Sequence, residues 1–293
     1  PIEDIPTLNW WEYGELYRDK LTSPLTITFA EVATHNHFVL DRGGKVFKQT
    51  APVIKLPESA SEDDHLRLLG VLNSSVACFW LKQKSKPKGG AAEHSWSRTY
   101  QFNGTTMKDF PLPVIPQPVD FAACLDALAT QLKRHTPAAV AARQAPTASA
   151  LNATHGEYIH LRASMIAQQE ELDWQYYRTY GLVDEDLTFG GELPGIALGE
   201  RAFEIALARK MKSGGETTAW FERHGSTPIT EIPTHLPADY RDLIQRRLDS
   251  IAASPNIRLL EKPEYKRRWA TEAWDKQVES ALCSWLLDRV EDR

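Results

Sequence analysis

A proline-rich stretch, residues 107–119, constrains the fold of this chain more than any other sequence feature. It reads MKDFPLPVIPQPV, and no helix can run through it because proline lacks a backbone N–H and clashes with the preceding helical turn. Strand-forming runs and glycine turns precede it, whereas apolar residues recur at helical spacing after it. The sequence therefore predicts an α+β protein, with a mixed strand and helix domain at residues 1–118, a helix and linker at 119–150, and a mainly α-helical domain at 151–293.

The first domain carries both strand and helix signals. Asp41-Arg42-Gly43-Gly44 has the composition of a tight turn, in which glycine supplies the positive φ. We expect this turn to join two antiparallel strands, Ala33–Leu40 and Lys45–Ile54. Ser61, followed by three acidic residues, indicates a helix N-cap. The other elements expected here are the helices Trp10–Lys20 and Ser61–Gln83 and the strand Arg98–Phe102.

Helical periodicity dominates from Phe121 onward. Gly181 is expected to end the longest helix, and the segment 135–150, rich in Ala, Pro and Thr, is expected to be a linker or an exposed edge. The predicted helices are Phe121–Arg134, Thr154–Tyr180, Gly199–Lys212, Ala238–Ala253 and Pro263–Arg289.

Composition and charge narrow the classes of function. With 42% hydrophobic and 25% charged residues, the chain has the composition of a soluble globular protein, and it contains no signal peptide and no apolar run of membrane length. Cys78, Cys124 and Cys283 lie far apart, which predicts reduced thiols and a cytoplasmic setting. The net charge of −5 argues against a generic polyanion binder. Lysines and arginines nevertheless concentrate at residues 42–55 and 82–108, which favours nucleic-acid binding by one part of the chain.

His35, Asn36 and His37 spell the name of a metal-dependent nuclease motif, but that motif spreads its three residues over a hairpin and a following helix. On a strand, alternate side chains share a face, so both imidazoles are expected on one side and the Asn36 amide on the other. Two histidines without a third nearby ligand do not predict a zinc site. The segment is therefore either a polar strand end or a hairpin that offers imidazole, amide and guanidinium groups to a partner.

None of the polar clusters forms a recognisable catalytic site. The chain has no G-x-x-x-x-G-K-[ST] phosphate loop, no G-x-G-x-x-G after a strand and no G-x-S-x-G elbow. Residues 264–266 match the E-x-K half of a nuclease signature without its upstream Pro-Asp partner. The polar run 73–75 is expected to cap a helix or to bond a neighbouring loop. The basic spots at residues 246–247 and 266–268 fit a solvated helix face, a DNA-backbone contact or a brace between domains.

Several stretches resemble a known family. LLGVLNSSVACFWL (Leu68–Leu81) followed by MKDFPLP (Met107–Pro113) resembles the target-recognition domain of adenine-specific DNA methyltransferases. FAEVATHNHFVLDRGGKVF with APVIKLP (Phe29–Pro57) is similar to the PglX-like methyltransferases of phage-defence systems of the phage growth limitation and BREX kind. QQEELDWQYYRTYGL (Gln168–Leu182) and GERAFEIALARK with AWFERHGSTPITEIP (Gly199–Pro233) resemble the helical C-terminal part of the same family. The resemblance covers nearly the whole chain.

The resemblance implies transfer of a methyl group from S-adenosylmethionine to N6 of adenine in a short asymmetric DNA site. The signature of that step, Asn-Pro-Pro followed by an aromatic residue, does not occur in this sequence, nor does a glycine-rich cofactor strand. No catalytic, cofactor-binding or metal-binding residue is therefore assigned. The resemblance predicts that the catalytic domain lies upstream and that this region selects the DNA target. The implied partners are double-stranded DNA, that methyltransferase domain and other phage-defence proteins.

Candidate DNA-binding residues lie on the expected hairpin and on the lysine-rich run after the expected helix. Amide side chains suit an adenine edge, guanidinium and ammonium groups suit guanine, and exposed cations suit phosphates. The candidates for the groove are His35, Asn36, His37 and Arg42. The candidates for phosphates are Lys45, Lys48, Lys82, Lys84, Lys86, Lys88 and Arg98.

Other interpretations fit the same residues. The helices could assemble a defence complex without reading bases, or the region could be the specificity part of a restriction enzyme. A flexible solvated loop explains the lysine run equally well. Asn36 could read a base or hydrogen-bond backbone in a buried turn.

Overall fold

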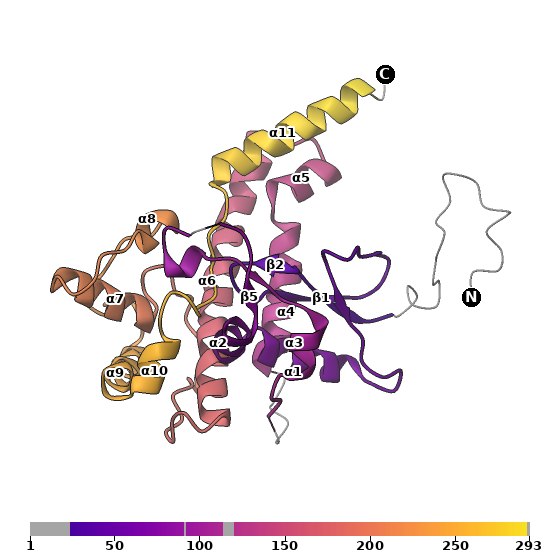
Figure 1. The fold of residues 1–293 in the computed structure, drawn as a ribbon. Helices are drawn as coiled ribbons and strands as arrows, with labels where there is room; N and C mark the ends of the chain where they lie inside the picture. Colours follow the sequence, from indigo (N-terminus) through magenta and orange to yellow (C-terminus); the bar gives the residue numbers. More distant parts are fainter. Residues whose placement is uncertain (1–23, 91, 114–119, 292–293) are drawn as a thin grey trace, which may run out of the picture.

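The computed structural model describes residues 24–90, 92–113 and 120–291, and it confirms the α+β class, with short strands in the first third and helices after it (Figure 1). The helix expected at Trp10–Lys20 lies outside the described residues. The strands are β1 (Thr26–Phe29), β2 (Val32–Ala33), β3 (Phe38–Asp41), β4 (Val53–Ile54), β5 (Lys86–Pro87) and β6 (Tyr100–Gln101). The helices are α1 (Glu62–Leu72), α2 (Ser75–Lys84), α3 (Gly104–Lys108), α4 (Asp120–Arg134), α5 (Pro137–Arg143), α6 (Ala148–Thr179), α7 (Ala202–Lys212), α8 (Trp220–Arg223), α9 (Ala238–Ala253), α10 (Pro255–Leu260) and α11 (Trp274–Glu291).

The first sheet has the strand order β3-β1-β4, so the hairpin expected between residues 33–40 and 45–54 is wrong. β1 lies between the other two strands and pairs antiparallel with both, which places Ile27 opposite Leu40 on one side and Ile54 on the other. Gly43 and Gly44 do adopt positive φ, 90° and 79°, as the turn composition predicts. The chain beyond them does not return to β3; its strand β4 pairs with the other edge of β1.

The second sheet has the order β2-β6-β5 and contains the expected strand near residue 100. Val32 pairs with Gln101 on one side of β6, and Lys86 pairs with Gln101 on the other. Part of the lysine-rich run is therefore an edge strand rather than a free loop.

The helix expected at Ser61–Gln83 is divided into α1 and α2. Ser61 caps α1 through a capping box, as predicted. Ser74 starts α2, and its Oγ accepts a hydrogen bond from the backbone N–H of Ala77 at 3.2 Å. The Asn73 side chain bonds both the N–H and the carbonyl of Phe38 at 3.0 Å, so the polar run at 73–75 joins the helices to β3 as expected.

The structure confirms some of the helix bounds predicted for the second half of the chain and contradicts others. α4 and α9 form where periodicity places them, and Gly181, with φ of 67°, follows the end of α6. The segment 135–150 is not a linker, since it contains α5 and the start of α6. The helix expected from Pro263 begins only at Trp274, which leaves residues 263–273 largely without regular structure.

The long helix α6 runs through the middle of the molecule (Figure 1). Its residues Leu172 and Tyr176 pack with the first sheet and α1, whereas Trp174 and Tyr177 pack in a second apolar cluster with residues of α7, α9 and α10. The two apolar clusters therefore share α6. No helix within the described ranges combines the length and apolarity needed to cross a membrane.

Candidate functional site

Asn36 is buried and does not lie on the surface of the protein. Its side chain is 5% exposed, and its Nδ2 donates to the carbonyls of Leu72 at 2.6 Å and Ser74 at 3.1 Å. The amide therefore holds the segment before β3 against the junction of α1 and α2. This corrects the assignment of Asn36 to a DNA groove and supports its alternative role as a scaffold.

The two flanking histidines share a face, as alternation predicts. Their rings are nearly parallel, with 16° between the planes and 6.4 Å between the centroids. His37 is exposed and His35 is half-buried. These imidazoles remain candidates for contact with a partner, while Asn36 does not.

Three predicted cations already have neighbours within the protein. Arg42 Nη2 lies 2.5 Å from Glu62 Oε1 and 2.6 Å from Asp126 Oδ2. Lys45 Nζ lies 3.4 Å from Asp41. Lys82 is only 5% exposed, and its Nζ donates to the carbonyl of Glu264, which corrects its assignment as a surface phosphate contact.

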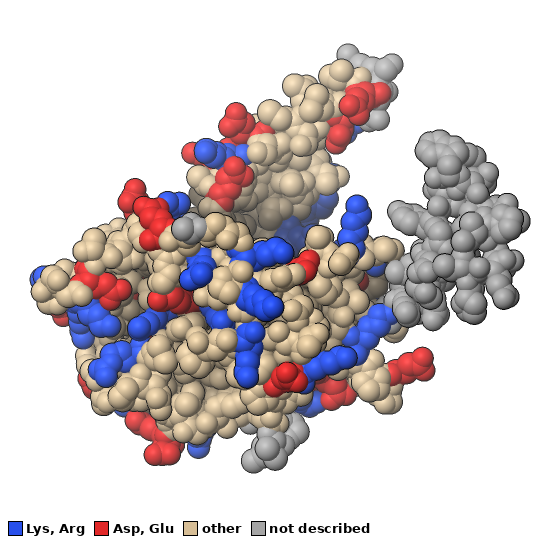
Figure 2. Space-filling model, in the orientation of Figure 1, with Lys and Arg blue, Asp and Glu red and all other residues tan. Residues whose placement is uncertain are grey.

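The remaining predicted cations are more accessible. Lys48 is exposed, and Lys84, Lys86, Lys88 and Arg98 are all exposed side chains. Among the described residues, no ion pair involves the last four, which we call the basic face. Figure 2 shows lysine and arginine side chains gathered around the position of β5 and β2. The structure therefore brings the lysines that precede the loop at 89–97 close to Arg98, which follows it.

Two further arginines, which sequence analysis did not assign to the site, lie in the segment between α10 and α11. Arg267 Nη1 is 3.3 Å from Asn73 Oδ1, and the Arg268 guanidinium lies 5.3 Å from the centre of the Trp96 ring. Both side chains are half-buried, and neither forms an ion pair in the part of the chain that the structure describes. We define the cationic seam as His35, His37, Lys82, Arg267 and Arg268.

Burial dominates the electrostatics of the cationic seam. It lowers the pKa of Arg267 and of Arg268 to about 10, and it also lowers the pKa of Lys82. The His37 residue is exposed at the surface, but protein atoms surround much of its imidazole, and this desolvation, followed by the charge of Arg267, lowers its pKa to about 4. The pKa of His35 falls through burial and then through Arg268 and Arg267. At neutral pH the seam therefore combines three charged side chains with two neutral imidazoles.

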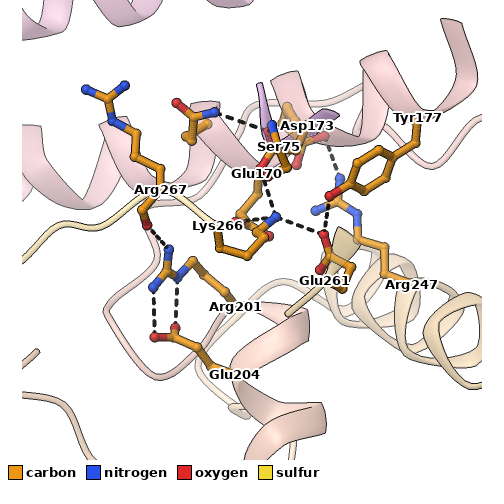
Figure 3. A network of polar contacts seen from close by, with 12 residues as sticks. Ser75, Glu170, Asp173, Tyr177, Arg201, Glu204, Arg247, Glu261, Lys266 and Arg267 are labelled. Atoms are coloured by element: carbon orange, nitrogen blue, oxygen red, sulfur yellow. Dashed lines mark hydrogen bonds and ion pairs between the residues drawn. The ribbon is translucent and has the colours of Figure 1, made fainter. Parts of the chain in front are cut away.

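A buried polar network fixes the backbone that carries these arginines (Figure 3). Lys266 Nζ lies 2.8 Å from Asp173 Oδ2, 2.9 Å from Glu261 Oε1 and 3.3 Å from Glu170 Oε1. Arg201 Nη1 donates to the carbonyl of Arg267 at 2.9 Å. Figure 3 shows the Arg267 side chain extending away from this network.

These contacts correct two predictions. Lys266 is 1% exposed and Arg247 is also buried, 2.7 Å from Glu171 Oε2. Neither residue lies on a solvated helix face. Lys266, the lysine of the E-x-K match, is held among three carboxylates and serves the internal structure.

A cavity of about 90 Å³ lies beside the cationic seam and is lined by His37, Asn73, Gln169 and Arg267. Most of the other lining residues are apolar. Gln169 Oε1 is buried and has no hydrogen-bond partner among the described residues. Within the described ranges, no three His, Cys, Asp or Glu side chains are grouped so that they could bind a metal ion.

Comparisons with known proteins define the class. Residues 165–293 match a family model described as a domain of unknown function, DUF7008. Over 298 aligned residues the chain is 51% identical to the adenine-specific methyltransferase PglX of Streptomyces coelicolor. The alignment covers 97% of this chain and 24% of that relative, so the chain is homologous to about a quarter of a PglX-type methyltransferase, and the family resemblance is confirmed. No solved structure matches the chain.

Proposed function

We propose that this region binds duplex DNA and selects the target for an S-adenosylmethionine-dependent N6-adenine methyltransferase. The observation that carries the proposal is the basic face: Lys84, Lys86, Lys88 and Arg98 are exposed without ion pairs among the described residues, although the chain has a net charge of −5. Cations gathered on one side of an acidic protein attract a polyanion to that side. The methyltransferase named as a relative supports DNA as that polyanion.

Target selection fits the chemistry that such a methyltransferase performs. An adenine must leave the base stack before its N6 is methylated, so the enzyme must hold the duplex on both sides of the target. Lysines and arginines that contact phosphates set the register of the protein on the duplex. His37, which is exposed, and His35, which is half-buried, are candidates for a groove contact, and Lys45 and Lys48 are further candidates for phosphates.

The salt dependence of binding tests this proposal. We expect the full-length protein to bind duplex DNA with an affinity that falls with salt at a logarithmic slope of about −0.9 for each phosphate contacted. Replacing Lys84, Lys86, Lys88 and Arg98 with glutamine should flatten the slope. The matched control is the replacement of Lys210 and Lys212, exposed near the end of α7, which should leave the slope unchanged. Binding that does not respond to salt would reject the proposal.

A role in protein assembly is the second candidate. α11 projects from the body of the molecule (Figure 1) and exposes Leu282, Leu286, Leu287 and Val290. Exposed apolar stripes of this kind commonly mark protein contacts. Other phage-defence proteins, or another part of the same protein, are the partners that fit this role, and a cytoplasmic setting fits the free thiols of Cys78, Cys124 and Cys283.

A further inference from the structure

We propose that the cationic seam binds a phosphodiester group of DNA, with Arg267 and Arg268 as its principal contacts. This inference rests on the proposed function and adds a second contact surface to it. The two arginines lie in the C-terminal half of the chain, in a segment whose sequence pattern predicts a helix, whereas the other three members of the seam belong to the first third. The seam would make residues 264–269 a DNA contact in addition to the front domain.

Charge is the first argument. Lys82, Arg267 and Arg268 are partly or largely withdrawn from water. The carboxylate that acts on both Lys82 and Arg268 is that of Glu264, and the one that acts on Arg267 is that of Asp173, which is already paired with Lys266. Glu264 itself accepts a hydrogen bond from Ser95 at 2.7 Å. Desolvated cations without adequate counter-charge are costly. An anion seated in the seam would offset that cost.

Unused hydrogen-bond donors are the second argument. The Nε and Nη2 atoms of Arg268 are buried and have no hydrogen-bond partner among the described residues, and its guanidinium lies against Trp96. The Arg267 guanidinium lies 5.1 Å from the centre of the Trp269 ring, and within the described ranges its one side-chain hydrogen bond is long, 3.3 Å to Asn73. Guanidinium groups bind phosphate oxygens through parallel N–H donors. The neutral rings of His35 and His37 add further N–H donors without raising the charge.

The position of these groups favours phosphate over a base edge. Arg267 and Arg268 are half-buried, so their ligand must protrude towards them. Phosphates line the outside of a duplex, whereas base edges lie at the floor of its grooves. A recessed guanidinium therefore meets a phosphate more readily than a guanine.

Rigidity is the final argument. Lys266 is enclosed by Asp173, Glu261 and Glu170, Arg201 donates to the carbonyl of Arg267, and Arg162 donates to the carbonyl of Trp269. The backbone on both sides of the arginine pair is thus fixed before a ligand arrives. Binding to such a prearranged site costs less conformational freedom.

A salt titration with two duplexes tests the inference in the full-length protein. Changing Arg267→Gln and Arg268→Gln should weaken binding by about tenfold or more, equally on a target duplex and on a scrambled duplex. The slope against salt should shrink by about 0.9 for each phosphate that the variant no longer neutralises. Arg267→Lys with Arg268→Lys should keep the slope because the charge remains. Arg178→Gln with Arg246→Gln, two exposed arginines paired with Asp186 and Glu185, is the matched control.

Arginine footprinting of the unaltered protein gives a second readout that does not depend on how the variants fold. Duplex DNA should protect Arg267 and Arg268 from phenylglyoxal, while Arg246 should stay reactive. An unchanged slope without protection would overturn the phosphate site, and weaker binding confined to the target duplex would overturn it in favour of base reading. If the unaltered protein shows no salt-dependent binding at all, the proposed function itself fails.

Discussion

Lys266 Nζ lies 2.8 Å from Asp173 Oδ2, a contact between residues 93 positions apart in the chain. The same ammonium lies 2.9 Å from Glu261, and Asp173 accepts hydrogen bonds from Ser75 at 2.6 and 2.8 Å. One lysine therefore joins the segment between α10 and α11 to α6, while Asp173 extends the network to α2. Because these contacts are internal, moving the segment into solvent would leave the carboxylates of Glu170 and Asp173 buried without their cation, which is costly.

The Lys266→Met substitution should strongly destabilise the protein. It would leave Glu170, Asp173 and Glu261 buried without their shared cation, and breaking a buried ion pair in this way costs about 3–5 kcal/mol. The free energy of unfolding from denaturant titration measures the effect. Lys276→Met, at an exposed position of α11, should change it by less than about 0.5 kcal/mol. Equal stability of the two variants would contradict the role given to Lys266.

The Glu170→Gln substitution should alter how stability depends on pH. Burial raises the pKa of Glu170 to about 7, against the opposing effect of Lys266. The folded protein therefore holds a proton that the unfolded chain releases, so this residue makes stability fall as pH rises from about 4.5 to about 7. Glutamine cannot titrate. Over that interval the free energy of unfolding of the variant should therefore rise relative to that of the native protein, by at most about 3 kcal/mol.

Unfolding midpoints measured at pH 5 and pH 8 for both proteins provide the check. The unfolding midpoint of the variant, relative to that of the native protein, should be higher at pH 8 than at pH 5. A difference that is constant with pH would mean that Glu170 is ionised throughout.

The Asn36→Ala substitution should damage stability and not recognition. It removes the donor to the carbonyls of Leu72 and Ser74, and leaving buried acceptors unpaired costs about 1–3 kcal/mol. At temperatures where the variant stays folded, its duplex affinity and methylation target should be those of the native protein. A changed target sequence with unchanged stability would restore the base-reading assignment.

The titration of His37 tests the geometry of the cationic seam. Its pKa should be about 4, lowered by burial and then by the charge of Arg267. NMR of the ring protons measures this value directly. Because burial is the larger cause, changing Arg267→Gln should raise the pKa only part of the way towards the ordinary histidine value of about 6.5. A pKa of His37 that is the same in the variant and the native protein would mean that the two side chains do not lie side by side.

Local chemistry made much of the helical framework predictable. Ser61 with three following acids marks the start of α1, and alanine- and leucine-rich periodicity places α4 and α9 within a residue of their observed bounds. Gly181 marks the end of α6 because it adopts a left-handed φ of 67°. Each of these signals acts over a few residues of sequence.

Long-range contacts explain what the sequence did not reveal. β1 separates β3 from β4 through pairings that hairpin composition does not encode. The run 263–273 has helical spacing, but contacts from Lys266 to α6 and from Arg267 to Arg201 hold it in another conformation. Residues 266–268 form a single basic run in the sequence, but in the structure Lys266 is a buried structural residue and the two arginines are half-buried.

Site-specific adenine methylation by the full-length protein tests the central claim most directly. With Lys84, Lys86, Lys88 and Arg98 changed to glutamate, we predict a large loss of methylation that low salt partly restores, because phosphate contacts are electrostatic. Changing Lys210 and Lys212 to glutamate should leave methylation intact. Normal methylation by the fourfold variant, at physiological salt and with the fold preserved, would contradict the account.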